Sequence, residues 1–182
     1  MSQARAPREF IPLAIAVLTV SDTRGLADDR SGDTLVGRLT EAGHRLADRA
    51  IVPDDVEAIR AKVRAWIADP AVDVVVTTGG TGFTGRDVTP EAIEPLFEKR
   101  MDGFSTIFHQ ISFGKIGVST VQSRATAGVA GATYIFCLPG SPGACRDAWD
   151  GILASQLDYR HLPCNFVEIM PRLDEHLRRK KS

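Results

Sequence analysis

The sequence predicts an α/β domain: a three-layer sandwich with a mostly parallel central sheet flanked by helices. Short apolar or β-branched runs alternate along the chain with longer segments of helical periodicity. The chain has 182 residues, 43% of them hydrophobic and 25% charged, which suits one soluble domain with a full core. We expect a flexible segment at residues 1–10, a single domain over residues 11–172 and a basic tail at residues 173–182.

Four segments have the composition of buried strands. Residues 11–20 (IPLAIAVLTV) are continuously apolar, as expected for a strand covered on both faces. Residues 44–52, 72–78 (VDVVVTT) and 134–138 are the other expected strands. Polar loops follow the first, third and fourth of these runs directly. Because ligands bind beyond the carboxyl ends of parallel strands, we expect these loops to open at one edge of the sheet and bind a ligand there.

Helical segments separate the expected strands, and capping residues, prolines or glycines delimit them. Three of the expected helices have Ser31, Asp54 or Asp55, and Thr89 as their N-caps. Two further helices are expected at residues 103–113 and 144–159. The helix after Thr89 is expected to reach about residue 98. Residues 117–131 are rich in small side chains, and their periodicity favours neither a helix nor a strand.

Charge and cysteine content exclude several classes of protein. A formal net charge of -1 gives no general attraction to nucleic acid or to anionic membranes, and the basic run at residues 178–181 favours a solvated helix end. Three cysteines without C-x-x-C spacing predict neither a zinc site nor a disulfide framework. No apolar run is long enough to span a membrane and no targeting segment is evident, so we expect a cytoplasmic protein.

A glycine-rich loop follows the third expected strand, with the sequence TTGGTG at residues 77–82. Gly79, Gly80 and Gly82 have no Cβ to keep a ligand away from the main chain, and N–H groups here and at Thr81 can face an anion. The loop is neither a Walker A sequence nor G-x-G-x-x-G. It favours a phosphate or polar heterocycle, although a tight turn would also explain the two adjacent glycines.

Charged side chains lie near this loop in the sequence. Asp87 follows it within RDVTPE, and Asp54 follows the second expected strand within VPDD. Either carboxylate suits Mg²⁺ bound to a nucleotide phosphate, but helix capping is an alternative explanation for both. Ser123 and Arg124 would add a hydroxyl and a cation for phosphate.

Two further loops carry polar groups at the expected binding edge. TVSDTR at residues 19–24 supplies Ser21, Asp22 and Arg24, whose hydroxyl, carboxylate and guanidinium suit a polar ligand, although an ordinary loop would also explain them. LPGSPG at residues 138–143 supplies Gly140, Ser141 and Pro142. The prolines restrict the shape of the second loop, and its glycine permits close approach to the main chain. Ser141 is also a natural helix N-cap, so an anion site and a simple turn both remain open.

The order of these motifs resembles the MoaB/MogA family of molybdenum-cofactor biosynthesis proteins. The resemblance covers roughly residues 13–172 and rests on TVSDTR (19–24), SGD (31–33), TTGGTGFTGRDVTPEA (77–92) and LPGSPGA (138–144). Residues 59–67, 122–130, 144–149 and 163–166 resemble the MoaB branch in particular.

This resemblance implies a molybdopterin-binding fold, a homotrimer or hexamer, and Mg²⁺-dependent adenylylation of molybdopterin by ATP. The phosphate of molybdopterin attacks the α-phosphate of ATP, pyrophosphate leaves, and the product passes to a molybdenum-insertion enzyme. The two carboxylates that serve catalysis and metal binding in the family correspond to Asp54 and Asp87. The family's pterin and nucleotide contacts correspond to the glycine loop, Ser21, Asp22, Thr89 and the loop that contains Gly140, Ser141 and Pro142.

Two other functions remain open from the sequence. Because some MoaB relatives lack adenylylation activity, one alternative is that the chain binds or carries molybdopterin without modifying it. Retention of Asp22, Asp54 and Asp87 favours an enzyme. A flavodoxin-like redox module shares this order of strands and helices, but the first loop lacks the T-G-x-T pattern expected for a flavin phosphate.

Overall fold

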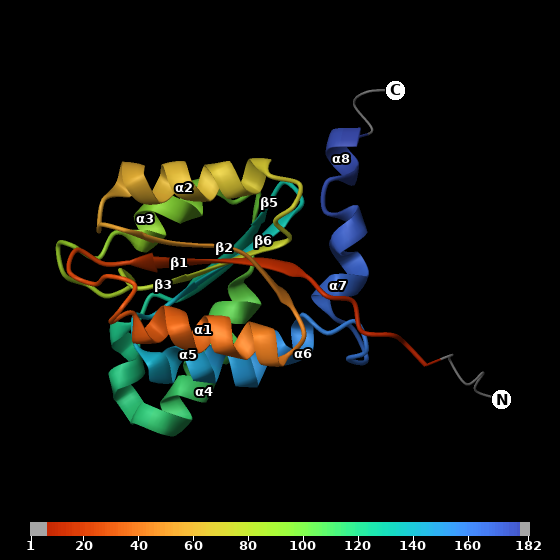
Figure 1. Cartoon of the computed structure of the whole chain (residues 1–182). Helices are drawn as coiled ribbons and strands as arrows, with labels where there is room; N and C mark the ends of the chain where they lie inside the picture. Colours follow the sequence, from red (N-terminus) through yellow and green to blue (C-terminus); the bar gives the residue numbers. More distant parts are fainter. Residues whose placement is uncertain (1–6, 179–182) are drawn as a thin grey trace.

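The computed structural model describes residues 7–178 and confirms the three-layer α/β architecture (Figure 1). The domain limits stay a prediction, because parts of the expected segments 1–10 and 173–182 lie outside the described residues. Most of the basic run 178–181 lies outside them as well. The six strands are β1 (Ala14–Val20), β2 (Arg45–Val52), β3 (Val74–Thr78), β4 (Lys99–Arg100), β5 (Thr126–Ala130) and β6 (Thr133–Leu138).

The helices vary widely in length, and 3₁₀ or π turns extend several of them. The α-helices are α1 (Arg30–Glu41), α2 (Val56–Ala68), α3 (Thr89–Ile93), α4 (Asp102–Ile116), α5 (Pro142–Ala148), α6 (Ala154–Gln156), α7 (Phe166–Ile169) and α8 (Glu175–Arg178). The 3₁₀ turns are Glu94–Leu96, Gly117–Gln122 and Met170–Arg172, and a π turn spans Trp149–Leu153 between α5 and α6. Within residues 7–178, no helix has the length and apolar character needed to cross a membrane.

The strands form one sheet in the order β2-β1-β3-β6-β5-β4. β2, β1, β3 and β6 are parallel neighbours, while β5 pairs antiparallel with β6, and β4 pairs antiparallel with β5. The carboxyl ends of β1, β3 and β6 therefore meet at one edge. In register, Thr19 of β1 lies opposite Thr78 of β3, which lies opposite Leu138 of β6.

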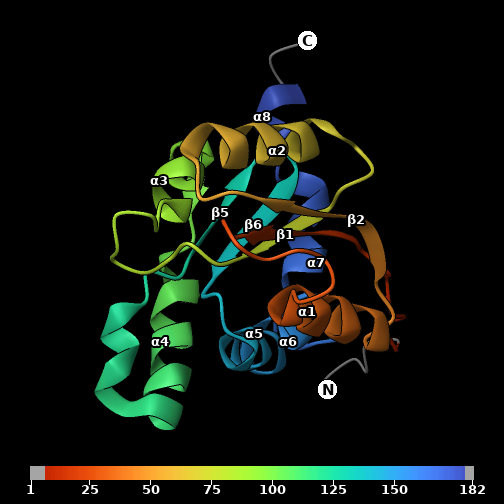
Figure 2. The ribbon, with the colours of Figure 1, turned by 60° about the vertical axis from the view of Figure 1, so that its left-hand side comes forward.

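Helices cover both faces of this sheet (Figures 1 and 2). On one face, α2 and α3 bury a core that includes Ile59, Val63 and Ile93. On the other face, α1, α4 and α5 bury a larger core that includes Leu35 and Phe108. Every residue of β1 and β3 is buried, which confirms that their continuous apolar sequences belong to strands covered on both sides.

Two predicted N-caps are wrong. Asp29, not Ser31, caps α1, because its carboxylate accepts a hydrogen bond from the Gly32 N–H at 2.9 Å. Ser31 is instead buried, and its hydroxyl donates to the Gly140 carbonyl at 3.1 Å. Thr89 is the first residue of α3, which has no side-chain cap.

Several predicted boundaries also move. α3 ends at Ile93 rather than near residue 98, because Pro95 begins a different turn and cannot donate a main-chain hydrogen bond. The first strand begins at Ala14, after Pro12, and the last helical stretch runs over residues 142–156 with the π turn inside it. Part of the unassigned segment 117–131 forms β5.

Candidate functional site

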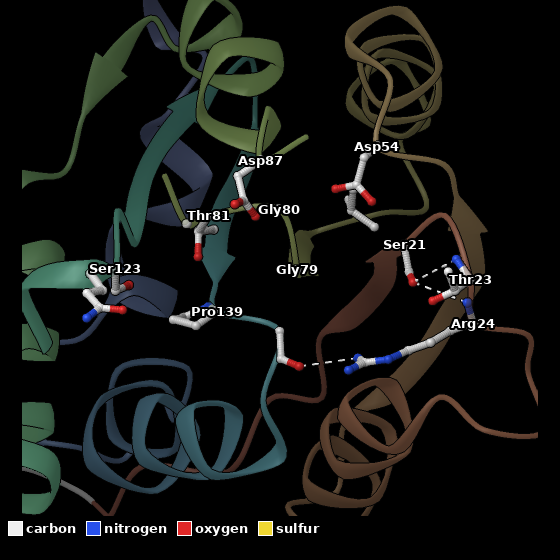
Figure 3. A pocket seen from close by; sticks show the side chains of 14 residues that line it. Ser21, Thr23, Arg24, Asp54, Gly79, Gly80, Thr81, Asp87, Ser123 and Pro139 are labelled. Atoms are coloured by element: carbon white, nitrogen blue, oxygen red, sulfur yellow. Dashed lines mark hydrogen bonds between the residues drawn. The ribbon is translucent and has the colours of Figure 1, made fainter. Parts of the chain in front are cut away.

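The three loops after β1, β3 and β6 surround one pocket, as the sequence predicts (Figure 3). The pocket has a volume of about 390 Å³ and opens to solvent. Residues from the three loops, from the start of the α2 region and from the end of the 3₁₀ turn Gly117–Gln122 line it. These are Val20, Ser21, Thr23, Arg24, Asp54, Gly79, Gly80, Thr81, Gly82, Asp87, Gln122, Ser123, Pro139 and Gly140.

The glycine loop is a turn that only glycine can form at two positions. Gly79 and Gly80 have φ angles of 101° and 65°, in the left-handed region that disfavours other residues. A Cβ on Gly79 would overlap the Val20 carbonyl, and a Cβ on Gly80 would overlap the Thr89 hydroxyl. The glycines therefore permit both the turn and its close packing against the ends of β1 and α3.

The hydrogen bonds that hold the glycine turn use its carbonyl groups and leave some of its main-chain N–H groups for a ligand. The carbonyls of Gly79 and Gly80 accept from the Thr89 hydroxyl at 2.8 Å and the Thr89 N–H at 2.9 Å. The Thr81 carbonyl accepts from the Arg124 N–H at 3.0 Å. Among the residues that the structure describes, the N–H groups of Gly80 and Thr81 donate no hydrogen bond. Consecutive free donors in such a turn suit an anion.

Asp54 lies beside the glycine turn and does not cap α2. Its carboxylate accepts from the Asp22 N–H at 3.1 Å, while its own N–H donates to the Asp22 carboxylate at 3.0 Å. Asp55 is the cap, since its carboxylate accepts from the Ala58 N–H at 2.8 Å. A Cβ on Gly80 would lie 3.1 Å from the Asp54 carboxylate, so the two residues are immediate neighbours.

Asp87 lies on the other side of the turn, and helix capping does not explain it either. Its carboxylate accepts from the Thr84 N–H at 2.8 Å and the Thr84 hydroxyl at 2.6 Å. A Cβ on Gly82 would lie 2.8 Å from this carboxylate. The N-cap position of α3 belongs to Val88. Both predicted carboxylates therefore flank the glycine turn, and Figure 3 shows them beside Gly80 and Thr81.

The environment gives the acidic groups different pKa values. Hydrogen bonds from Arg86 hold the pKa of Asp22 below its usual value. Burial and the nearby negative charge of Asp22 raise the pKa of Asp54. Burial opposes ionisation of Asp87, but hydrogen bonds from Thr84 outweigh it and lower its pKa. The clustered negative charge would be relieved by a bound cation.

Other predicted site residues lie further from the pocket surface. Thr89 is fully buried and braces the glycine turn, so the prediction that it contacts the ligand is not supported by its position. Ser141 caps α5 by accepting from the Ala144 N–H at 3.1 Å, and neither it nor Pro142 lines the pocket. Asp22 borders an adjacent hollow and forms an ion pair with Arg86 at 2.8 Å.

A family model described as "Probable molybdopterin binding domain" matches residues 16–159. Molybdenum cofactor biosynthesis protein B of Escherichia coli K12 is 56% identical over 158 residues, which cover 87% of this chain and 93% of that protein. The chain belongs to the MoaB family of molybdenum cofactor biosynthesis proteins. This membership decides against the flavodoxin-like redox module.

Other members of the MoaB family extend this similarity. Molybdenum cofactor biosynthesis protein B of Bacillus subtilis is 44% identical over 142 residues, covering 78% of this chain and 84% of that protein. A crystal structure of a molybdenum cofactor biosynthesis protein B superposes with a TM-score of 0.77 at 37% identity, covering 96% and 99% of the two chains. The tungsten cofactor synthesizing protein MoaB from Pyrococcus furiosus gives 0.72 at 32% identity, with 90% and 98% covered.

Sequence reasoning missed part of the pocket of this MoaB-family chain. Arg24 is not among the missed residues, because the guanidinium of TVSDTR is expected to contribute to a polar ligand site, and the structure places it on the pocket wall next to Gly140. Gln122 reaches the pocket from a segment that periodicity left unassigned. Arg124, expected to bind phosphate, instead donates to the carbonyls of Gly82 and Asp87 at 2.9 and 2.8 Å and pairs with Glu91. These contacts brace the loop.

Proposed function

We propose that the chain binds molybdopterin and transfers an adenylyl group from ATP to the molybdopterin phosphate. One observation carries this proposal: the carboxylates of Asp54 and Asp87 flank a glycine turn whose Gly80 and Thr81 N–H groups have no acceptor among the described residues. Attack of one phosphate on another needs positioned anions and neutralised charge rather than a protein nucleophile. The pocket offers N–H donors that would position the phosphates, and carboxylates that would hold a Mg²⁺ ion to neutralise their charge.

The acidic groups fit Mg²⁺ better than a metal that needs a complete protein cage. Mg²⁺ in nucleotide sites is held by one or two carboxylates, with water and substrate phosphates as the remaining ligands. Within residues 7–178, no group of three or more His, Cys, Asp or Glu side chains has the arrangement of a metal site. Asp54 and Asp87 would hold the ion, which when bound neutralises charge on the ATP phosphates.

The chain itself supplies binding and orientation. The free N–H groups at Gly80 and Thr81 would hold phosphate oxygens, and Ser21 and Gly140 would border the rest of the ligand. The glycines let these oxygens approach the main chain closely, and Thr89 keeps the turn in place from beneath. The attacking oxygen belongs to molybdopterin, so no side chain needs to form a covalent intermediate.

The decisive experiment is incubation with molybdopterin, ATP and Mg²⁺, with detection of pyrophosphate and adenylylated molybdopterin. Asp87→Asn and Asp54→Asn should each lower turnover by at least about a hundredfold, because several kcal/mol of charge stabilisation depend on the metal ligands. Asp55→Asn is the matched control, since asparagine caps a helix as well as aspartate.

The outcomes separate the enzyme from a binding protein. If the wild-type chain binds molybdopterin but releases no pyrophosphate, the chain is a molybdopterin binder and the adenylylation proposal fails. If Asp54→Asn changes only thermal stability, Asp54 is not a metal ligand. If Asp55→Asn lowers turnover as much as Asp54→Asn, the effect belongs to the α2 region in general.

A further inference from the structure

Arg24 differs from the other arginines around the pocket in what its guanidinium contacts. Its Nη1 donates to the Ser31 hydroxyl at 3.0 Å and to the Gly140 carbonyl at 3.2 Å, both of them neutral acceptors. Within the part of the chain that the structure describes, no carboxylate forms an ion pair with it. Arg24 therefore brings to the pocket wall a positive charge that no ion pair within the described residues engages.

Arg86 and Arg124, two further arginines near the pocket, already have charged partners. Arg86 places two donors on the Asp22 carboxylate at 2.9 and 2.8 Å. Arg124 pairs with Glu91 and donates to two main-chain carbonyls of the loop. An anion that recruited either arginine would have to replace an existing charged partner, whereas an anion at Arg24 would displace only neutral acceptors.

The pocket therefore has two electrostatic poles. Asp54 and Asp87 lie on one side, and the Arg24 guanidinium lies on the other (Figure 3), where it contacts the Gly140 carbonyl. Arg24 remains close to the glycine turn, because it contacts the Gly140 carbonyl and a Cβ on Gly140 would lie only 3.1 Å from Gly79 Cα. A phosphate at this pole would touch both the guanidinium and the neighbouring loops.

We propose that Arg24 binds a phosphate group of one of the two substrates at the pole opposite the carboxylates, and so fixes the direction in which that substrate lies. Guanidinium suits this task because its planar fork offers parallel donors to phosphate oxygens. Ser31 and the Gly140 carbonyl hold the side chain at the pocket before the ligand arrives. The inference rests on the proposed function only for the identity of the ligands.

The test measures binding rather than turnover and uses Arg24→Gln, Arg24→Lys and the wild-type chain. One arm titrates molybdopterin without nucleotide, and the other titrates ATP with Mg²⁺ without pterin. Arg24→Gln should raise the Kd in one arm by at least about tenfold, since a charged hydrogen bond is lost, and Arg24→Lys should recover part of the loss. The affected arm identifies the substrate whose phosphate Arg24 holds.

Two controls distinguish phosphate recognition from a structural effect or from net charge. Dephosphorylated molybdopterin and adenosine should bind the wild-type chain and Arg24→Gln equally. Arg64→Gln removes the same charge from an exposed position of α2 that does not line the pocket, and should leave both Kd values unchanged. Circular dichroism checks that the variants are folded.

The proposal is overturned if Arg24→Gln leaves both Kd values unchanged, if Arg64→Gln weakens binding equally, or if the dephosphorylated ligands lose as much affinity. Wild-type binding without pyrophosphate release would refute adenylylation while the Arg24 comparison still stands. Normal turnover with unchanged binding by Arg24→Gln would refute only the role of Arg24. A wild-type chain that bound neither ligand would overturn both proposals.

Discussion

At the level of single residues, the buried carboxylate of Asp29 joins β1 to α1. It accepts from the Thr19 hydroxyl at 2.7 Å and pairs with Arg49 at 2.8 Å. Asp29→Ala should lower the free energy of unfolding by about 3 kcal/mol, because it removes a helix cap and leaves Arg49 without its buried partner. Asp33→Ala removes the exposed partner of Arg49 and should cost less than about 1 kcal/mol. Urea denaturation measures both, and equal losses would contradict this account.

The same residue predicts a pH dependence. Burial opposes ionisation of Asp29, but hydrogen bonds from Arg49, Gly32 and Thr19 outweigh it and lower its pKa in the folded chain. The unfolded chain therefore binds the proton more readily, so this contribution to stability is present above the unfolded pKa and is lost as pH falls through the folded pKa. Below pH of about 4, the wild-type chain should lose stability more steeply than Asp29→Ala. Parallel pH profiles would contradict the prediction.

Residue types near the pocket were predictable, but the directions of their side chains were not. The positions of Asp54 and Asp87 in the sequence leave metal binding and helix capping both open, and the family resemblance is what implies metal binding; in the structure both flank the turn. Thr89 stands in an equally suggestive motif, yet its hydroxyl points beneath the turn. Arg24 and Arg124 show the same limit. Partners far along the chain decide which of the two guanidinium groups is held by main-chain carbonyls of the loop and an ion pair, and which one faces the pocket.

At the level of elements, the turn between β3 and α3 depends on Thr89. Its hydroxyl is buried and donates to the Gly79 carbonyl. Thr89→Val keeps the shape but leaves that carbonyl without its donor, so the free energy of unfolding should fall by about 1–3 kcal/mol. Thr89→Ser should restore much of the loss. Thermal and urea unfolding test this, and a Thr89→Val variant with full stability would show that the hydroxyl is not needed to hold the turn.

Elements with a strong periodic signal were predicted, and those shaped by distant contacts were not. The continuous apolar sequences of β1 and β3 lie in a sheet covered on both faces, where no polar alternation is expected. β5 was missed because its small residues suit close packing: a Cβ on Gly128 would overlap the Phe97 ring. Nothing in the local sequence around Gly128 reveals that ring.

At the level of the whole molecule, the order of the strands explains why separate loops form one site. Parallel strands β1, β3 and β6 are neighbours, so their carboxyl ends deliver three loops to one edge. That consequence was predictable from the alternation of strands and helices. The antiparallel addition of β5 and β4 was not, because it depends on a two-residue strand and on the unassigned segment before β6.

The surface of α4 and the 3₁₀ turn after it bears on assembly. Five large apolar side chains there are exposed: Ile107, Phe113, Ile116, Val118 and Val121. These two elements project at one end of the molecule (Figure 2). Exposed apolar patches in soluble proteins mark interaction surfaces, and soluble oligomers use them in closed symmetric contacts. We therefore propose that this surface contributes to the trimer or hexamer that the family resemblance implies.

Sedimentation of the purified chain should give the mass of a trimer or of a hexamer, because burying these side chains between copies removes apolar surface from water. The double variant Val118→Asp/Val121→Asp should shift the chain toward a monomer, since two charges would have to be desolvated in the contact. Leu26→Asp changes another exposed apolar residue, in the loop after β1, and should leave the mass unchanged. A wild-type monomer would refute the assembly, and an intact oligomer of the double variant would place the contact elsewhere on the molecule.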